Sequence, residues 1–274
     1  MEVCRYEWFS ECFPYESNAA RRWFASRRHH RNGRGFAGWR WRSGVVGRGE
    51  CCIGPIERFD TSAFEVHNAG EVRGYDGTEH GLSKKEARRF ERFVQYAITA
   101  SDEALAEAGL DMESEDPTRV GVVYGSGIGG IDELQKSFFT LHDKGPSRVN
   151  PLFVPTMISN IVSGCLAIRY GMKGECINVV TACATGTHCI GQALRDIRHG
   201  YIDVALAGGS EEAVSEICIA GFSNLGALSK EEDPTKASLP FDARRHGFVA
   251  GEGAGAVVLE SLEHALDRGA NIIA

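Results

Sequence analysis

Residues 176–200 constrain the fold most, because an apolar strand there runs directly into a helix. The β-branched residues Ile177, Val179 and Val180, in a short apolar run, indicate the strand. Four apolar residues repeat at a spacing of about 3.6 and indicate the helix, which Gly200 ends. They are Ile190, Ala193, Leu194 and Ile197. This pattern predicts a strand–helix unit of a layered α/β protein.

Cys183 lies at the junction of this strand and helix, at or just before the first helical turn. The unpaired N–H groups and the positive end of the helix dipole favour an anion there, so we expect a reactive thiol. The same N–H groups could hold an oxyanion. Gly186 costs about 1 kcal/mol relative to Ala inside a helix, which suggests close approach of another group, such as a thioester. A buried, unreactive cysteine is the alternative.

Strands and helices alternate along the rest of the chain. We expect a helix capped by Ser83, a strand over 120–124, a helix over 131–142 and a buried helix over 156–170. Residues 248–260 predict a strand, a tight turn and a second strand. The apolar stripe of the first helix consists of Phe90, Phe93, Val94, Ala97, Ile98 and Leu105. This order is that of a layered α/β fold.

Five segments resemble a known family. They read GSGIGG at 125–130, NPLFVPTMISNIVSGCLAIRYGMKG at 150–174, TACATGTHCIG at 181–191, DVALAGGSE at 203–211 and PFDARRHGFVAGEGAGAVVLE at 240–260. In order and spacing they resemble the β-ketoacyl-acyl-carrier-protein synthases, the condensing enzymes of fatty-acid synthesis. The likeness covers 53–274 and is closest to the elongating type that uses separate carrier proteins. We therefore divide the chain into a segment 1–52 and a synthase N-terminal domain 53–274.

The resemblance implies a thiolase-like layered α/β/α fold, of which this chain is the first half of a pseudo-symmetric duplication. It makes Cys183 the acyl-accepting nucleophile, whose own N–H forms part of the oxyanion hole. Ile128 matches a residue lining the acyl-chain pocket near the dimer partner, and Phe222 matches an aromatic residue beside the catalytic cysteine. Asp242 and Arg245 fall in a buried polar motif, for which we expect a structural role.

The resemblance also implies a reaction in two steps. Cys183 takes an acyl group from acyl carrier protein, and malonyl-carrier then loses carbon dioxide to give a carbanion that attacks the acyl-enzyme. A pair of histidines assists the second step in the family, and none of the nine histidines here lies in a segment that resembles theirs. His188, five residues after Cys183, lies off the same helix face. No cofactor is implied.

The last residues indicate truncation. A helix over 264–269 is followed by the apolar, strand-like run 271–274, after which the family continues with its second half. We therefore expect partly uncovered apolar surface, a homodimer when the protein is full length, and no condensation by this chain alone.

Basic residues gather near the start of the first helix of an otherwise acidic domain. They are Lys84, Lys85, Arg88, Arg89 and Arg92. Positive charge in the first turns opposes the helix dipole and costs about 0.3–1 kcal/mol per residue, so the cluster calls for a functional reason. The family docks the acidic acyl carrier protein on the matching helix, which implies docking by Lys85, Arg88 and Arg89. A solvated polar face, partly neutralised by Glu86 and Glu91, is the alternative.

Residues 1–52 differ in composition from the rest of the chain. They hold all four tryptophans and ten arginines but no lysine, and 17–49 contains nine arginines without an acid. A frame error in the coding sequence, an organelle transit peptide and a basic nucleic-acid-binding arm are three explanations. Early glutamates and tryptophans disfavour a transit peptide, and no binding motif supports the arm. We therefore favour the frame error.

Charge and cysteine usage disfavour several classes of protein. The formal net charge of −7 combines +5 from residues 1–52 with −12 from the rest, which argues against nucleic-acid binding. No run reaches the apolar length of a membrane span. Nine cysteines show neither CxxC pairs nor metal-ligand spacing, so we expect no metal site and free thiols in a reducing cytoplasm.

Two other functions stay open at this point. A non-catalytic thiolase-like partner would dimerise or bind acyl carrier protein without turnover; the lack of the family's histidines favours it, and the presence of Cys183 disfavours it. A cysteine hydrolase would need a histidine brought close to Cys183. The length of the family likeness argues against a hydrolase.

Overall fold

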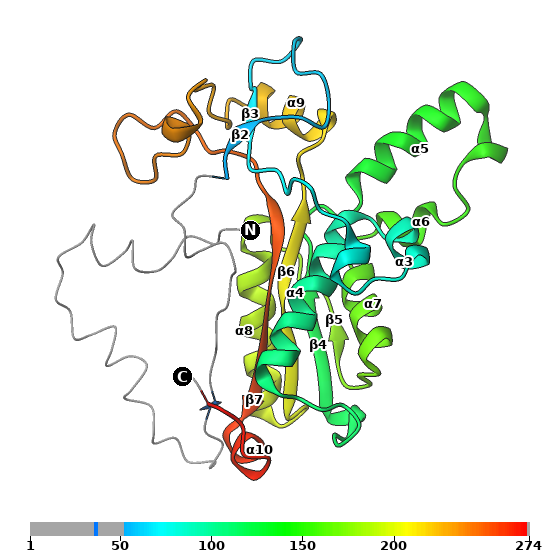
Figure 1. Ribbon diagram of the computed structural model, residues 1–274, viewed down its shortest axis with the longest axis vertical. Helices are drawn as coiled ribbons and strands as arrows, with labels where there is room; N and C mark the ends of the chain where they lie inside the picture. The colour runs from blue at the N-terminus through cyan, green and yellow to red at the C-terminus, as the bar shows by residue number, and fades with distance from the viewer. Residues whose placement is uncertain (1–35, 38–51, 273–274) are drawn as a thin grey trace.

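A five-stranded sheet forms the centre of the computed structural model, which describes residues 36–37 and 52–272. Its strand order is β1-β7-β6-β4-β5 (Figure 1). β4 is parallel to both of its neighbours, whereas β7 is antiparallel to β6 and to β1. The strands are β1 (Phe36–Ala37), β4 (Val120–Gly125), β5 (Cys176–Ile177), β6 (Val204–Glu212) and β7 (Glu252–Ser261). A separate antiparallel pair joins β2 (Gly54–Pro55) to β3 (Asn68–Ala69).

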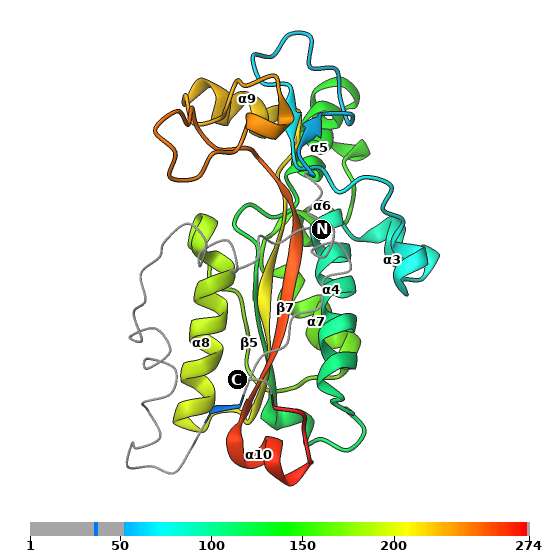
Figure 2. The same ribbon diagram turned by 60° about the vertical axis from the view of Figure 1, so that its left-hand side comes forward.

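Helices cover both faces of the sheet. Figure 2 shows α8 (Thr185–His199) on one face and α4 (Arg92–Ala108) with α7 (Ile161–Tyr170) on the other. This three-layer α/β/α arrangement confirms the layered α/β fold expected from the alternation of elements. The other α-helices of the described residues are α3 (Lys84–Arg89), α5 (Ile131–Lys144), α6 (Phe153–Met157), α9 (Glu216–Asn224) and α10 (Leu262–Asp267).

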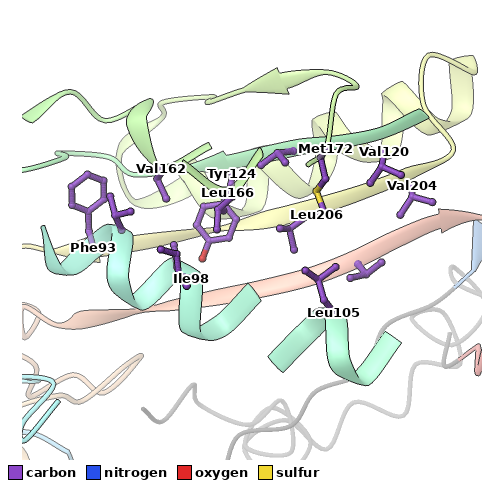
Figure 3. Packing of buried hydrophobic residues seen from close by; sticks show 14 of the residues in the cluster. Phe93, Ile98, Leu105, Val120, Tyr124, Val162, Leu166, Met172, Val204 and Leu206 are labelled. Atoms are coloured by element: carbon purple, nitrogen blue, oxygen red, sulfur yellow. The ribbon is translucent and has the colours of Figure 1, made fainter. Parts of the chain in front are cut away.

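Two apolar clusters hold the three layers together. On the face of α4 and α7, Phe93 and Ile98 pack against Tyr124 and Leu166 (Figure 3). On the other face, Ile197 of α8 belongs to a second cluster. Successive side chains of β4 alternate between the two clusters, as a strand buried on both faces requires. Burial of each large apolar side chain contributes about 1.5–3 kcal/mol, which makes the sheet a firm base for the loops at its ends.

The helix expected after Ser83 is two helices, so that prediction was wrong in its continuity. Ser83 does cap a helix, with a complete capping box to Glu86. However, α3 ends at Arg89, and α4 begins at Arg92. The side chain of Gln95 stabilises the break, because its Nε2 donates to the carbonyl oxygens of Ala87 (3.0 Å) and Phe90 (2.7 Å). Phe90 therefore lies at a corner rather than within one continuous stripe.

The buried helix expected over 156–170 is also divided, into α6 and α7. The glycine loop after β4 approaches this break. The N–H of Gly130 donates to the carbonyl oxygen of Met157 (2.9 Å), and a Cβ on Gly129 would lie 2.6 Å from the same oxygen. A tertiary contact thus decides where the helix is interrupted.

The glycine-rich run near residue 253 is one continuous strand, β7, and not the expected strand, turn and strand. It pairs with β6 from Glu252 to Glu260. A Cβ on Gly208 of β6 would lie 2.1 Å from the carbonyl oxygen of Gly255, so the two strands approach too closely for a side chain there. Gly253 has a φ of 151°, which other residues rarely adopt. The glycines permit close pairing rather than a turn.

The strand expected on Ile177, Val179 and Val180 is shorter than predicted, because β5 ends at Ile177 and Val180 is exposed. β4, α5 and α8 match the predicted strand and helices, and Gly200 ends α8 in the left-handed conformation. The expected strand over 271–274 is not formed by residues 271–272, and residues 273–274 lie outside the described residues. Of the segment 1–52, only residues 36–37 and 52 are among the described residues, so the hypotheses on this segment lie outside them.

His264 of α10 joins two carboxylates at the end of the sheet. Its Nε2 lies 2.8 Å from Glu115 Oε2, and its Nδ1 lies 2.9 Å from Glu260 Oε2, which Arg268 also contacts. Burial opposes the charged ring, but the hydrogen bonds and charges of Glu260 and Glu115 outweigh it and raise the pKa of His264 above its usual 6.5. A raised folded-state pKa stabilises the fold at pH values below the unfolded-state pKa.

We predict that this stabilisation is lost as the pH rises through the folded-state pKa of His264. The free energy of unfolding of the parent should exceed that of His264→Gln by about 0.5–1 kcal/mol at mildly acidic pH, where His264 is charged and Glu260, whose pKa is lowered, is still ionised. The difference should shrink as the pH rises through the raised pKa of His264. Urea unfolding across this range measures it. Glu115→Gln should weaken the pH dependence, and a parent–variant difference that grows with pH would contradict the prediction.

Candidate functional site

Cys183 lies on an exposed turn at the start of α8. A short 3₁₀ turn, Ala182–Ala184, leads into this helix, so the cysteine stands where the sequence predicted it, immediately before the first helical turn. Its side chain is exposed, whereas Cys189 is fully buried and its Sγ contacts the carbonyl oxygen of Val179 at 3.7 Å. The description of a buried, packed cysteine therefore fits Cys189 and not Cys183.

The residue before the cysteine has a strained backbone. Ala182 has a φ of 51°, a left-handed conformation that costs a residue with a Cβ about 1–2 kcal/mol. Neighbouring side chains hold the turn: the N–H of Thr181 donates to Oγ1 of Thr185 (2.9 Å), and Nδ1 of His188 lies 2.6 Å from Oγ1 of Thr181. This sharp turn presents Cys183 at the end of the helix. His188 is exposed, and its ring is bonded to the same turn.

The glycine loop 125–130 lies against this turn. A Cβ on Gly125 would lie 2.4 Å from Cγ2 of Thr185, and a Cβ on Gly127 would lie 3.3 Å from the carbonyl oxygen of Ala182. Glycine is therefore required for the loop to come so close. The contact places Ile128, which is half exposed, in the segment next to the turn that bears Cys183.

A carboxylate that the sequence analysis did not single out holds the glycine loop. Glu211, near the end of β6, accepts hydrogen bonds from Oγ of Ser126 (2.7 Å) and from the N–H groups of Gly127 (2.8 Å) and Ile128 (3.2 Å). Burial raises its pKa, although these bonds oppose the rise. One feature of the sequence could have pointed to Glu211: it is an acidic residue near the end of an apolar strand, and binding sites form at the carboxyl ends of parallel strands.

Phe222 lies on α9, in a third apolar cluster that includes Ile219 and Leu228. Its ring meets that of Phe248 edge to face, with centroids 5.6 Å apart. Phe248 in turn lines an open hollow of about 880 Å³, together with Ala227 and several residues of the segment 238–247. These contacts place Phe222 beside that hollow. Ile128, by contrast, lies in the loop that touches the Cys183 turn.

The basic residues Lys85, Arg88 and Arg89 are exposed on α3, which lies with α4 and α7 on the side of the sheet away from α8 (Figure 2). Because α3 ends at Arg89, Arg88 and Arg89 stand in its last turn, where the dipole favours positive charge. The expected dipole penalty was therefore wrong for these two residues. Their exposure, and not a helix penalty, is what distinguishes them.

Asp242 and Arg245 do not form a buried pair. Arg245 is exposed and Asp242 is half-buried. The carboxylate of Asp242 binds Arg244 instead, through its backbone N–H (2.8 Å), Nε (3.0 Å) and Nη2 (2.7 Å). The expectation of a buried motif was wrong because a local turn satisfies the aspartate from within three residues.

An apolar recess of about 250 Å³ lies between α3, α4, α6 and α7, and Phe90, Val94, Ile161 and Cys165 are among its lining residues. It stands on the opposite side of the sheet from α8 and does not include Cys183. Within residues 52–272, no group of three or more His, Cys, Asp or Glu side chains is placed to hold a metal ion. No helix in the same residues is long and apolar enough to cross a membrane.

Comparison with known families gives one extended match. The family described as "Beta-ketoacyl synthase, N-terminal domain" matches residues 43–265 and so begins inside the segment 1–52. Among curated proteins, a 3-oxoacyl-[acyl-carrier-protein] synthase 2 of Vibrio cholerae is 46% identical over 227 residues, which are 82% of this chain and 55% of that protein. The chain thus spans about half the length of the curated relatives that it matches.

Solved structures agree with this match. A β-ketoacyl synthase from Burkholderia phymatum aligns with a TM-score of 0.73 and 33% identity, over 82% of this chain and 55% of that one. A type II polyketide ketosynthase, bound to a hexaketide and in complex with its acyl-carrier protein, aligns with a TM-score of 0.71 and 29% identity, over 82% of this chain and 54% of that one. The layered α/β fold is therefore thiolase-like, as expected.

We predict that the backbone at position 182 controls the accessibility of Cys183. Ala182→Gly should preserve the turn, because glycine adopts a positive φ without strain. Ala182→Val should displace Cys183 and destabilise the chain by about 1–2 kcal/mol, because a β-branched residue resists this conformation. The rate of alkylation of Cys183 by iodoacetamide, read by peptide mass spectrometry, and urea unfolding measure the two effects. A valine variant that matches the parent in both would contradict the prediction.

Proposed function

Because the chain belongs to the β-ketoacyl synthase family, we propose that it takes part in fatty-acid chain elongation, with Cys183 as the nucleophile that accepts the acyl group. The exposed thiol on a strained turn at the positive end of α8 carries this proposal. A free, exposed sulfur is accessible to a bulky thioester. The presence of Cys183 favours a catalytic role over that of a non-catalytic partner.

The proposed reaction begins with transfer of an acyl group. The Cys183 thiolate attacks the carbonyl carbon of the acyl thioester, the tetrahedral intermediate expels the carrier thiolate, and an acyl-cysteine remains. We assign stabilisation of the oxyanion to the N–H of Cys183, at the start of α8. In the second step the malonyl thioester loses carbon dioxide, and the resulting carbanion attacks the acyl-cysteine and releases the thiolate. We assign none of the described histidines to assist the decarboxylation.

Ile128 and Phe222 are proposed to contact the acyl chain. Ile128 is half exposed in the loop that touches the Cys183 turn, so its side chain is available to an acyl group bound there. Phe222 presents an aromatic ring beside the hollow lined by Phe248. Both side chains are apolar, which suits an aliphatic substrate.

Lys85, Arg88 and Arg89 are proposed to dock an acidic acyl carrier protein, the kind of partner bound by the related polyketide ketosynthase. The nearby acids neutralise this patch only weakly. Glu86 is already bonded to the N–H of Ser83 and to Arg169 (3.0 Å). Burial and the charge of Glu212 raise the pKa of Glu91 to about 7, so it is partly uncharged near neutral pH. The three cations therefore present a net positive surface.

Two further features of the protein are proposed. The first is a homodimer, supported by exposed apolar side chains on α5, the helix that follows the loop of Ile128: Leu134, Phe138, Phe139 and Leu141. The second is a cytoplasmic location, supported by the free state of the cysteines in the described part of the chain, since reducing compartments keep thiols unpaired.

We predict that incubation with an acyl-carrier thioester adds one acyl group to this chain and that Cys183→Ser abolishes the adduct. A serine hydroxyl is far less nucleophilic than a thiol without an activating base. Intact-protein mass spectrometry detects the mass increase. Cys176→Ser is the matched control, since Cys176 is also exposed and belongs to the preceding strand, and it should load normally. An adduct that survives in Cys183→Ser would refute the assignment.

We also predict that the double variant Arg88→Glu, Arg89→Glu binds acyl carrier protein about tenfold more weakly, a loss of about 1.4 kcal/mol. The difference should diminish as salt screens the charges. Titration calorimetry at two ionic strengths measures both effects. Arg195→Glu, Arg198→Glu on α8 is the control, because it changes the net charge equally on the other side of the sheet. Equal weakening by the two double variants would count against a defined docking patch.

A further inference from the structure

Glu211 and Ser126 together bind the donors of the glycine loop. The two oxygens of Glu211 accept from Ser126 Oγ and from the N–H groups of Gly127 and Ile128, at 2.7, 2.8 and 3.2 Å. The oxygen of Ser126 then accepts from the N–H of Gly129 (2.8 Å). Three successive N–H groups therefore point to one carboxylate–hydroxyl pair, as in the backbone nests that bind anions.

The loop is confined on its other sides as well. A Cβ on Gly127 would lie 2.9 Å from Oε2 of Glu211, and a Cβ on Gly130 would lie 2.6 Å from the carbonyl oxygen of Thr156. The loop thus fills the space between the end of β6, the Cys183 turn and α6. A change in the Glu211 anchor would shift Ile128 relative to Cys183, because these residues of the loop form no strand pairing that could hold them.

From these contacts we propose that Glu211 is a positioning residue, which fixes Ile128 beside Cys183 and thereby sets which acyl chain lengths load onto the enzyme. The proposal rests on the function proposed above. Glu211 does not touch the reacting atoms; it acts through the loop. Small displacements of groups that contact a substrate change rates strongly, so a loop shift should favour some chain lengths over others.

The carboxylate of Glu211 suits this task, because both of its oxygens accept hydrogen bonds from the loop. In Glu211→Gln, one carboxylate oxygen becomes an amide NH₂, which donates hydrogen bonds and cannot accept them. This NH₂ faces either the N–H groups of the loop or the hydroxyl of Ser126. At least one loop donor then loses its partner. Ser126→Ala is a milder change, because it removes one hydroxyl and leaves the carboxylate in place.

Glu212 provides a matched control on the same strand. It is also a buried, hydrogen-bonded glutamate, with 3% of its side chain exposed. Its carboxylate binds Arg58 (2.5 Å) and the N–H of Arg92 (2.9 Å) instead of the glycine loop. Glu212→Gln therefore reports the cost of altering a buried carboxylate at this edge of the sheet without altering the loop.

The experiment compares the 274-residue parent chain with Glu211→Gln, Ser126→Ala and Glu212→Gln. Hydrogen exchange read by mass spectrometry reports on the loop amides, and intact-protein mass spectrometry gives the loading rates of butyryl-, octanoyl- and palmitoyl-carrier thioesters. In Glu211→Gln we expect about tenfold faster exchange at 127–129 and a change of about fivefold or more in the palmitoyl-to-butyryl rate ratio. Ser126→Ala should shift both in the same direction, and Glu212→Gln should leave the ratio within about twofold of the parent.

Each outcome decides the proposal. An unchanged rate ratio in Glu211→Gln and Ser126→Ala overturns it, as does an equal fall of all three rates, since that would show a general structural role. If Glu211→Gln does not fold, Ser126→Ala alone decides it. A parent chain that forms no adduct overturns the function proposed for Cys183 and the chain-length selection with it, while the exchange rates still show whether Glu211 holds the loop.

Discussion

The N-terminus of α8 lies directly on the backbone of β6, with Gly186 against Gly209. A Cβ on Gly209 would lie 2.9 Å from the Cα of Gly186, so no other residue at that point of the strand permits the contact. Gly125 gives the same close approach between the end of β4 and Thr185. The positions of the helix start, of the Cys183 turn and of the glycine loop all depend on this seam between a helix and two parallel strands.

The polar contacts follow from the seam. Because the carboxyl ends of β4 and β6 meet at one edge of the sheet, the loop that leaves β4 comes within reach of the last residues of β6. Glu211 and Glu212 are neighbours there but point to different partners, since successive side chains of a strand face opposite sides. One binds the glycine loop and the other binds Arg58. The end of β6 thus supports the turn region on one side and the segment between β2 and β3 on the other.

The proposed docking and reaction surfaces are separated by the sheet. Lys85, Arg88 and Arg89 stand on the side of α4 and α7, and Cys183 stands at the start of α8 on the other side (Figure 2). A carrier bound to α3 would have to deliver its acyl group along the edge of the sheet where β4 and β6 end. The glycine loop lies on that edge, which is consistent with a role for its position in selecting the chain.

The sequence by itself determined the layered α/β class, the family, and the place of Cys183 before α8, because these depend on local periodicity and on short motifs. It also located Ser83 and Gly200 as helix ends, since caps act within a few residues. Only the tertiary structure showed that two expected helices are divided, after Phe90 and after Met157. The carbonyl oxygen of Phe90 accepts a hydrogen bond from the side chain of Gln95, and that of Met157 accepts one from the glycine loop. The tertiary structure likewise showed that the glycines of β7 serve close strand pairing, and that Glu211 binds the loop of Ile128. The pairing of β6 with β7 and the bond from Ile128 to Glu211 join residues that lie far apart in the chain, and no local pattern encodes the distance between them.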